Sequence, residues 1–304
     1  VEGAGKLIPA CSAKVSDGMR IFTENERVIN ARKNILDLIL ADHDFDCPNC
    51  PKNGICRLQE YCLKYDIKKS SYTRKSKIFD IDTSNNFYSF NPNRCILCRK
   101  CVRVCRELQG RDVLTASGRG VFTHIEPPFN TGLGNSRCVS CGNCISVCPV
   151  GALVPKRNIP FENDEIKKTR TTCVYCGVGC QMNLLTKGDK VVGTEPLDVV
   201  PNNGLLCVKG AFAYNFVNHK DRLKTPLIKK DGIFVESSFD EAIAFIAEKL
   251  TNIKKIYGRE SIAGLTSARC TNEENYLMQK FMRAVIGNNN IDHCARLCHA
   301  TTVS

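Results

Sequence analysis

Apolar residues recur at helical spacing between Val28 and Leu40, with polar residues filling the positions between them. The segment Thr23-Glu24-Asn25-Glu26 directly before them is a capping box, which satisfies free N–H groups at the start of a helix. Together the two patterns predict a helix over about residues 24–41.

The last third of the chain alternates between helical and strand patterns. Capping boxes at Ser238–Glu241 and Thr271–Glu274 each open a predicted helix, and these helices end at Gly258 and Gly287. The apolar run from Ile262 to Thr266 lies between them and predicts a buried strand. Such alternation is typical of a parallel sheet, so we expect an α/β domain to begin here.

Three further segments lack either periodicity. Residues 64–93 are polar and basic, which predicts strands and loops. Residues 106–137 contain several Gly and Pro and predict mostly turns. Residues 155–170 carry Pro155, Pro160 and many charges, which predicts a linker.

Composition adds metal chemistry to this picture. Of the 304 residues 43% are hydrophobic, which allows packed cores, and 20 are cysteines, 15 of them in the clusters described below. We therefore expect free thiols in a reducing compartment, the cytoplasm, and no disulfide scaffold. No apolar run approaches roughly 18 residues, so no membrane span is predicted.

The net charge of +12 is a possible sign of nucleic-acid binding. It omits the cysteines, however, and a [4Fe–4S] core with four thiolates carries roughly −2. No nucleic-acid-binding motif is present, so we expect no nucleic-acid partner. The basic residues beside the cysteines are interpreted as partners of cluster charge: Arg94, Arg99, Lys100, Arg103, Arg106 and Arg137.

Two stretches share the spacing C-x2-C-x2-C-x3-C, and the second continues with Pro149. This is the bacterial ferredoxin run, in which three thiolates bind one [4Fe–4S] cube and the fourth binds its neighbour. Zinc sites usually split their ligands into two separated pairs, so this dense spacing favours iron. The predicted ligands are Cys95, Cys98, Cys101 and Cys148 for one cube, and Cys138, Cys141, Cys144 and Cys105 for the other.

A third group has the spacing H-x3-C-x2-C-x5-C and consists of His43, Cys47, Cys50 and Cys56. One neutral imidazole and three thiolates complete a site for zinc or for a cube. Cys62 follows on a predicted helix, and we expect it to be a structural thiol.

A fourth group consists of Cys173, Cys176, Cys180 and, after 26 residues, Cys207. Two apolar stretches in that interval flank Lys187-Gly188-Asp189-Lys190, which predicts a hairpin that returns the last ligand. We favour a cube here, with a zinc ribbon as the competing interpretation.

The motifs together resemble known oxidoreductases. The His43–Cys56 group with the two ferredoxin runs resembles the N-terminal part of the large iron–sulfur subunit of NADH dehydrogenases, which [FeFe] hydrogenases share. The segments Cys173–Cys180 and Gly204–Gly210 are similar to the opening of molybdopterin oxidoreductases. The segment Asp292–His299 is similar to the active-site stretch of formate dehydrogenases, so the chain resembles the catalytic (alpha) subunit of a molybdopterin-dependent formate dehydrogenase.

That resemblance implies roles for three residues. Cys298 would be the thiolate ligand of molybdenum or tungsten, held by bis-molybdopterin guanine dinucleotide, and a soft thiolate suits such a metal. His299 would take or relay the proton of formate, since histidine titrates near neutral pH. Lys209 would lie between the fourth cube and a pterin. On their own, these residues would be interpreted as a buried thiol, a satisfied histidine and a solvated lysine; Cys270 and Cys294 are expected to be structural.

Cys11 resembles the last ligand of a plant-type [2Fe–2S] site, whose other three cysteines this sequence lacks. We therefore expect an inactive fragment truncated at both ends, with the [2Fe–2S] cluster and the pterin cofactor in the full-length protein. The expected fold is α+β, with tandem iron–sulfur domains and then the start of an α/β molybdopterin-binding domain. The expected division is a [2Fe–2S] remnant at 1–22, the His/Cys3 domain at 23–80, the two-cluster ferredoxin at 81–160, a molybdopterin oxidoreductase 4Fe–4S domain at 161–222, and the start of the catalytic domain at 223–304.

The implied function is reversible oxidation of formate to CO2, with electrons leaving through four [4Fe–4S] clusters to a flavin- and NAD-binding subunit. One alternative is the noncatalytic electron-transfer subunit of an NADH-quinone oxidoreductase, which would not need Cys298. An [FeFe] hydrogenase is disfavoured because the molybdopterin motif stands where further cysteine motifs would be needed. A zinc-rich nucleic-acid binder is the last alternative, and metal analysis would distinguish it.

Overall fold

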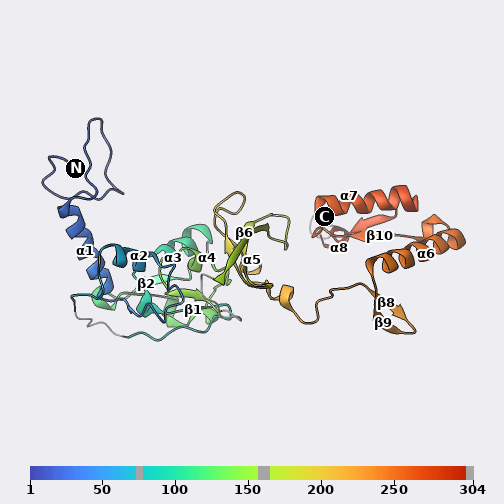
Figure 1. Cartoon of the computed structure of the whole chain (residues 1–304), viewed down its shortest axis with the longest axis horizontal. Helices are drawn as coiled ribbons and strands as arrows, with labels where there is room; N and C mark the ends of the chain where they lie inside the picture. The colour runs from blue at the N-terminus through green and yellow to red at the C-terminus, as the bar shows by residue number, and fades with distance from the viewer. Residues whose placement is uncertain (73–77, 157–164, 299–304) are drawn as a thin grey trace. The chain divides into compact units, whose positions relative to one another are not determined.

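The computed structural model describes residues 1–72, 78–156 and 165–298. It divides into two compact units, one formed by residues 1–167 and 204–211 and the other by 168–203 and 212–304. The elements are a mixture of short helices and small sheets, which confirms the predicted α+β class (Figure 1). No helix in the described ranges is long and apolar enough to cross a membrane.

The first unit begins with the helix that the N-terminal apolar pattern predicts. This helix, α1, spans Glu26–Leu40, and its cap is Asn25, whose side chain accepts the Val28 N–H at 2.9 Å. The predicted capping box at Thr23 was therefore wrong, because Asn25 lies in extended backbone immediately before the helix and makes the capping bond itself. The second helix, α2, spans Arg57–Lys64 and buries Cys62 to 3% exposure, in agreement with a structural thiol.

The ferredoxin region forms the core of the first unit. Strand β1 (Tyr88–Phe90), labelled in Figure 1, pairs antiparallel with β4 (Leu153–Pro155). Tyr88 lies opposite Pro155 in this pair. Helix α4 (Asn143–Ser146) packs against β4 and against α3 (Lys100–Arg103), which continues as the π-helical turn η2 (Val104–Leu108). These elements meet over fully buried apolar side chains that include Tyr88, Val150 and Leu153.

The predicted turns of residues 106–137 enclose a small antiparallel pair, β2 (Thr115–Ser117) and β3 (His124–Glu126). The remaining regular structure of the first unit consists of short 3-10 turns, which agrees with the Gly- and Pro-rich sequence. They are η1 (Pro92–Arg94), η3 (Gly120–Phe122), η4 (Pro128–Asn130) and η5 (Leu133–Asn135).

The second unit opens with a three-stranded sheet in the order β5-β6-β7. Strands β6 (Gln181–Lys187) and β7 (Lys190–Pro196) are joined at Gly188, which has φ +58°, so the predicted hairpin is confirmed. Strand β5 spans Lys167–Thr172 and thus occupies the end of the predicted 155–170 linker, a part of the prediction that was wrong. Its polar sequence resembled a linker because its side chains are largely exposed. Residues 157–164 of that linker lie outside the described residues.

Four short elements follow this sheet in the sequence, before the α/β part. Helix α5 spans Val208–Phe212, and the 3-10 turn η7 spans Asn215–Asn218. Strands β8 (Leu227–Lys230) and β9 (Ile233–Glu236) form an antiparallel hairpin.

The α/β part follows its predicted caps. Helix α6 (Phe239–Tyr257) has both bonds of the Ser238–Glu241 capping box, and Gly258 follows it with φ +83°. Helix α7 (Asn272–Lys280) likewise has the Thr271–Glu274 box and continues as the π-helical η9 (Phe281–Ile286). The chain then turns at Gly287, where φ is +91°.

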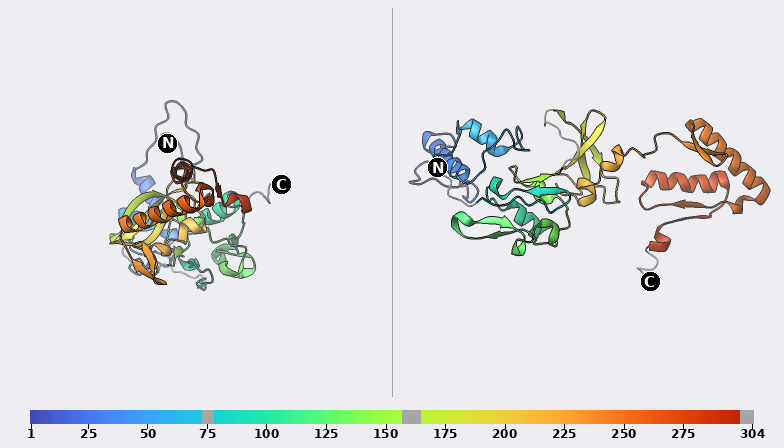
Figure 2. Two further views of the ribbon diagram at one scale, coloured as in Figure 1. Left: turned by 90° about the vertical axis from the view of Figure 1, so that its right-hand side faces the viewer. Right: turned by 90° about the horizontal axis from the view of Figure 1, so that it is seen from below.

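Strand β10 (Gly264–Thr266) pairs in parallel with β11 (Ile291–His293), which confirms the predicted parallel sheet. The predicted strand was two residues too long, because Ile262 instead ends the 3-10 turn η8 (Arg259–Ser261). Helix α7 packs against β10 (Figure 2). The last element is α8 (Ala295–Cys298).

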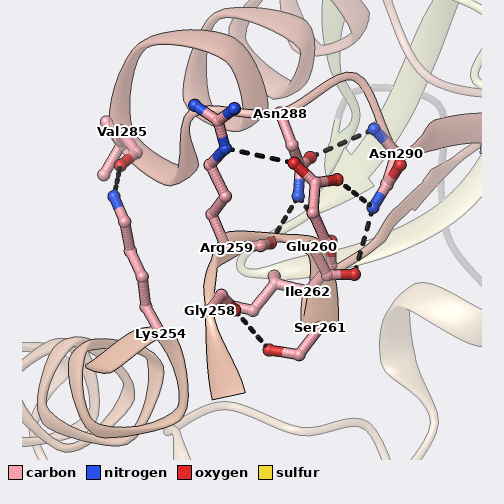
Figure 3. A network of polar contacts seen from close by, with 9 residues as sticks. All are labelled: Lys254, Gly258, Arg259, Glu260, Ser261, Ile262, Val285, Asn288 and Asn290. Carbon is pink, nitrogen blue, oxygen red and sulfur yellow. Dashed lines mark hydrogen bonds and ion pairs between the residues drawn. The ribbon is translucent and has the colours of Figure 1, made fainter. Parts of the chain in front are cut away.

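A network of polar contacts fixes the approach to β11 (Figure 3). The Asn288 amide is 8% exposed and donates to the carbonyls of Arg259 and Ile262 at 2.6 and 2.9 Å. Its Oδ1 accepts the Asn290 N–H at 3.0 Å, and the Asn290 amide donates to Glu260. The network therefore holds the 287–290 turn against η8 and sets the position from which β11 starts.

Candidate metal centres

The two ferredoxin runs, Cys95–Cys105 and Cys138–Cys148, have matching backbone conformations. The residue two positions after the first cysteine is left-handed in both, Leu97 with φ +55° and Ser140 with φ +53°. The N–H of each of these residues donates to the preceding cysteine Sγ at 3.3 Å. A left-handed residue also follows the second cysteine of each run, Arg99 in one and Gly142 in the other.

Left-handed backbone costs a non-glycine residue about 1–2 kcal/mol, so its repetition at Leu97, Arg99 and Ser140 requires compensation. The N–H bonds to sulfur provide part of it, and they are strongest when the sulfur is a thiolate. Only Gly142 signalled this conformation in the sequence. The loops are therefore shaped to present their N–H groups to cysteine sulfur.

The fourth cysteine of each run lies beside the other run. The pKa of Cys95 is raised to about 11 and that of Cys101 to about 12, mainly by burial, and negative charge on Cys148 contributes to both increases. Burial also raises the pKa of Cys141, and charge on Cys138 and Cys105 adds to that effect. The structure thus brings Cys148 toward the first three cysteines of the first run, and Cys105 toward those of the second run, as the exchanged ligand sets require.

The donor set fits two [4Fe–4S] clusters. Its buried thiols would be costly as free thiolates, whereas iron supplies the compensating positive charge. Asn143, between Cys141 and Cys144, is 1% exposed, and its Nδ2 has no hydrogen-bond partner among the residues described. A sulfur acceptor next to this loop would satisfy that buried donor. Within the described ranges, no three His, Cys, Asp or Glu side chains are grouped closely enough to hold a single metal ion.

The His/Cys3 site is the group His43, Cys47, Cys50 and Cys56, and all four residues line one small pocket. Burial raises the pKa of Cys47, and charge on Cys56 and Cys50 raises it further. Cys62 lies close by: its pKa is raised to about 11, mainly by burial, and negative charge on Cys47 and Cys56 contributes to the increase. The structure therefore assembles the predicted group, with Cys62 buried behind it.

Arg94 joins the His/Cys3 site to the first ferredoxin run and was predicted only as a partner of cluster charge. Its side chain is 14% exposed, and its Nε lies 3.6 Å from an Asp44 carboxylate oxygen. Its Nη2 donates to the Asn49 carbonyl at 3.4 Å, and its charge acts to lower the pKa of Cys47. Because Cys95 directly follows Arg94 in the sequence, this cation lies next to both candidate sites.

The fourth group is divided between the two units. Cys173 and Cys180 lie at the base of the β5–β6 pair, where the Cys173 N–H donates to the Cys180 carbonyl at 2.8 Å. Cys207 and Lys209 belong to the 204–211 segment of the first unit. The Leu206 N–H in that segment donates to Asn143 Oδ1 at 3.0 Å, so the segment is tied to the second ferredoxin run. Cys207 and Lys209 are not placed relative to the Cys173–Cys180 loop.

Cys298 ends α8, is exposed, and donates its N–H to the Cys294 carbonyl at 3.1 Å. His299 lies outside the described residues. The segment begins at the carboxyl end of parallel strand β11, the edge where α/β sheets collect their sites. Arg296 and Asp292 form an ion pair at 2.8 Å that braces the segment.

Cys294, predicted as structural, is an exposed thiol. The Ala268 N–H at 3.4 Å and the Ser267 hydroxyl lower its pKa. Its position at the end of β11, next to the loop after β10, explains why both groups reach it. Cys270 is half-buried.

Comparison with known proteins places these sites in named domain families. Residues 32–71 match the iron–sulfur binding region of the NADH-ubiquinone oxidoreductase G subunit, and residues 86–154 match the ferredoxin-like domain of NADH-quinone oxidoreductase subunit 3. Residues 166–219 match the molybdopterin oxidoreductase Fe4S4 domain, and residues 222–304 match molybdopterin oxidoreductase.

The whole chain is also similar to longer curated proteins. It is 35% identical over 337 aligned positions to "Probable oxidoreductase YjgC" of Bacillus subtilis, covering 97% of this chain and 34% of that protein. It is 33% identical over 341 positions to a "Putative formate dehydrogenase" of Staphylococcus aureus, covering 99% of this chain and 35% of that protein. The chain thus spans about a third of the length of these relatives.

Among solved structures, the chain is similar to an NAD+-reducing [NiFe]-hydrogenase, with a TM-score of 0.45 and 29% identity over 48% of this chain and 62% of that one.

Proposed function

From a chain composed of tandem iron–sulfur domains followed by the start of a molybdopterin oxidoreductase domain, we propose that the protein is a formate dehydrogenase. The reaction would convert formate to CO2, one proton and two electrons. The observation that carries the proposal is the Asp292–Cys298 segment at the carboxyl end of β11, with its resemblance to the formate dehydrogenase active site. The S. aureus relative, named for that activity, is aligned over 99% of this chain.

A bis-pterin molybdenum or tungsten group would supply the two-electron oxidation when bound. Cys298 would hold the metal through its Sγ, which is exposed at the end of α8. His299 would hold the proton released from formate on its imidazole, and Lys209 would place a positive charge near the fourth cluster. The Arg296–Asp292 ion pair would keep the segment bearing Cys298 in place.

Electrons would then leave through the cysteine clusters. The fourth group, with Cys207, would pass them to the second ferredoxin run, to which the Leu206–Asn143 bond ties the Cys207 segment. The first ferredoxin run would follow, and then the His/Cys3 site, which Arg94 joins to it. A flavin- and NAD-binding subunit would be the acceptor.

The test is formate-dependent dye or NAD reduction by the anaerobically purified full-length protein that contains this chain, with iron, molybdenum and tungsten measured on the same sample. We expect about 16 iron atoms for four cubes, and loss of formate oxidation in Cys298→Ala. Cys270→Ala, which removes a half-buried thiol of the same domain, should retain activity. Wild-type protein with a full metal content and no formate oxidation would refute the proposal.

The second candidate is an electron-transfer subunit of an NADH-quinone oxidoreductase. The matches at 32–71 and 86–154 to subunits of such enzymes favour it. It predicts that Cys298→Ala leaves NADH-linked electron transfer unchanged and that formate is not oxidised.

A further inference from the structure

The thiol of Cys138 has hydrogen-bonding partners that its counterpart in the first run lacks. Tyr88 Oη lies 3.1 Å from the Cys138 Sγ, in addition to the Ser140 N–H at 3.3 Å. Asn85 supports the position of Ser140, because its amide donates to Ser140 Oγ at 2.9 Å. The Cys138 thiol thus lies within hydrogen-bonding distance of a phenolic hydroxyl as well as of a backbone N–H group.

Tyr88 is held in place by burial and by the pairing of its strand. It is 1% exposed, and its strand pairs with β4, Tyr88 lying opposite Pro155. Its hydroxyl hydrogen-bonds Cys144 as well as Cys138. Since both cysteines belong to one ferredoxin run, a single buried hydroxyl serves two predicted ligands of the same cluster.

The cluster predicted for Cys95, Cys98, Cys101 and Cys148 has no such hydroxyl group among the residues that the structure describes. Among the described residues, no side chain donates a hydrogen bond to the thiols of Cys95, Cys98, Cys101 or Cys148; Cys95 accepts only the Leu97 N–H, at 3.3 Å. The Cys148 Sγ faces the Val150 carbonyl oxygen at 3.2 Å, an acceptor. The side-chain donors are therefore concentrated on one of the two candidate clusters.

We propose that Tyr88 tunes the cluster held by Cys138, Cys141, Cys144 and Cys105, its hydroxyl donating to cysteine sulfur and raising the reduction potential of that cluster. The proposal depends on the proposed function only in requiring a [4Fe–4S] cluster at these thiols. A one-electron reduction places more negative charge on the sulfurs, so a donor at Cys138 stabilises the reduced state more than the oxidised state. Tyr88 would thereby favour residence of the electron on this cluster.

The test is an EPR-monitored redox titration of the anaerobically purified protein and its Tyr88→Phe variant, with dithionite as reductant. At a fixed potential, we expect the ratio of reduced to oxidised protein for one cluster to fall by roughly three- to tenfold in Tyr88→Phe. This fall corresponds to a midpoint potential about 30–60 mV lower, at 59 mV per tenfold. A Cys141→Ser variant identifies the signal of this cluster. Tyr65→Phe is the matched control, because Tyr65 is also buried and its hydroxyl bonds Arg32 at 3.2 Å.

Site-specific replacement of Tyr88 by 3-fluorotyrosine provides a second variant that keeps the hydroxyl and the ring shape. Its more acidic hydroxyl should raise the midpoint potential, opposite to Tyr88→Phe, and this variant decides the question if Tyr88→Phe fails to bind iron. Unchanged potentials in the variants that retain iron would overturn the proposal. Formate oxidation is measured on the full-length protein carrying the same substitutions: activity without a potential shift refutes the tuning alone, and a shift without activity refutes the proposed function alone.

Discussion

A Cβ atom placed on Gly151 would lie 2.4 Å from the Cys50 Sγ, well inside any tolerated contact. The backbone of the ferredoxin region at Gly151 therefore lies directly against a thiol of the His/Cys3 site. Glycine is required here by close approach and not by an unusual backbone angle, since Gly151 is absent from the positive-φ residues of the described chain.

Gly151→Ala should consequently displace Cys50 and disturb the His/Cys3 site. We expect overpacking to destabilise the protein by about 1–3 kcal/mol and the iron content to fall by up to one cluster. Urea unfolding and iron analysis measure the two effects. Gly5→Ala is the control, because nothing lies within 4 Å of its added Cβ; equal iron contents and midpoints in the two variants would contradict the predicted contact.

Arg94 should set the electrostatic environment of the His/Cys3 cluster. Arg94→Gln removes a half-buried charge beside Cys47 and leaves the Asp44 carboxylate without this partner. Because positive charge favours the reduced cluster, we expect its midpoint potential to fall. Redox titration measures the change, with the exposed Arg57→Gln as control, since among the described residues the Arg57 guanidinium donates only to Tyr61 Oη on the same helix at 3.4 Å. A rise in potential, or no change, would refute this role.

Asn143 should be required to hold the Cys207 segment. Asn143→Ala removes the acceptor of the buried Leu206 N–H, and a buried group left unsatisfied costs about 1–3 kcal/mol. Urea unfolding should show that loss, and Cys207 should react faster with alkylating agents in the metal-free protein. The exposed Asn135, whose amide donates to the Thr131 carbonyl at 3.1 Å, provides the control Asn135→Ala. An unchanged Cys207 rate would show that the segment is held by other contacts.

The cysteine spacings predicted the candidate clusters, and the capping boxes predicted α6 and α7, because both signals are local in sequence. The partners that surround the thiols could not be predicted in the same way. Tyr88 and Asn143 reach Cys138 and Leu206 across 50 and 63 positions, and Gly151 meets Cys50 from a different domain of the sequence. Arg99, by contrast, carries no local signal of the left-handed backbone that its place in the repeat imposes.

Local patterns also failed where two signals competed. Thr23 and Asn25 both precede α1, and only the three-dimensional course of the chain selects Asn25 as the cap. The polar sequence of β5 resembles a linker because its side chains are mostly exposed, and the strand is defined by pairing with β6.

The Asn288 network should control how firmly the segment leading to Cys298 is held (Figure 3). Asn288→Ala removes three hydrogen bonds and leaves the buried Ile262 carbonyl and the partly buried Arg259 carbonyl without this donor, so we expect a loss of about 1–3 kcal/mol. Hydrogen exchange at β11 should accelerate, while exchange at β6 and β7 should not change. Asn289→Ala, at an exposed neighbouring position, is the control; equal exchange rates at β11 in both variants would contradict the role of the network.

Glu126 should make the β2–β3 hairpin sensitive to acid. Burial raises the pKa of this carboxyl, but hydrogen bonds from Ser117 and His124 outweigh burial, so its pKa lies below the ordinary value of 4.5. Both nitrogens of the His124 ring face acceptors, Glu126 Oε2 at 3.0 Å and the Phe122 carbonyl at 2.9 Å, and the ring stacks on Phe79. A carboxyl with a depressed folded-state pKa stabilises the protein fully above its unfolded-state pKa, and that stability is lost as the pH falls through the folded-state value.

The urea midpoint of wild type should therefore fall more steeply below pH 4.5 than that of Glu126→Gln. Glu248→Gln is the control and should follow the wild-type pH dependence, because Glu248 lies in an exposed position of α6. Any loss of iron in acid affects all three proteins and is cancelled by comparing them. Parallel curves for wild type and Glu126→Gln between pH 7 and pH 3, roughly the range over which carboxyls titrate, would show that the Glu126 carboxylate does not contribute to the stability of the hairpin.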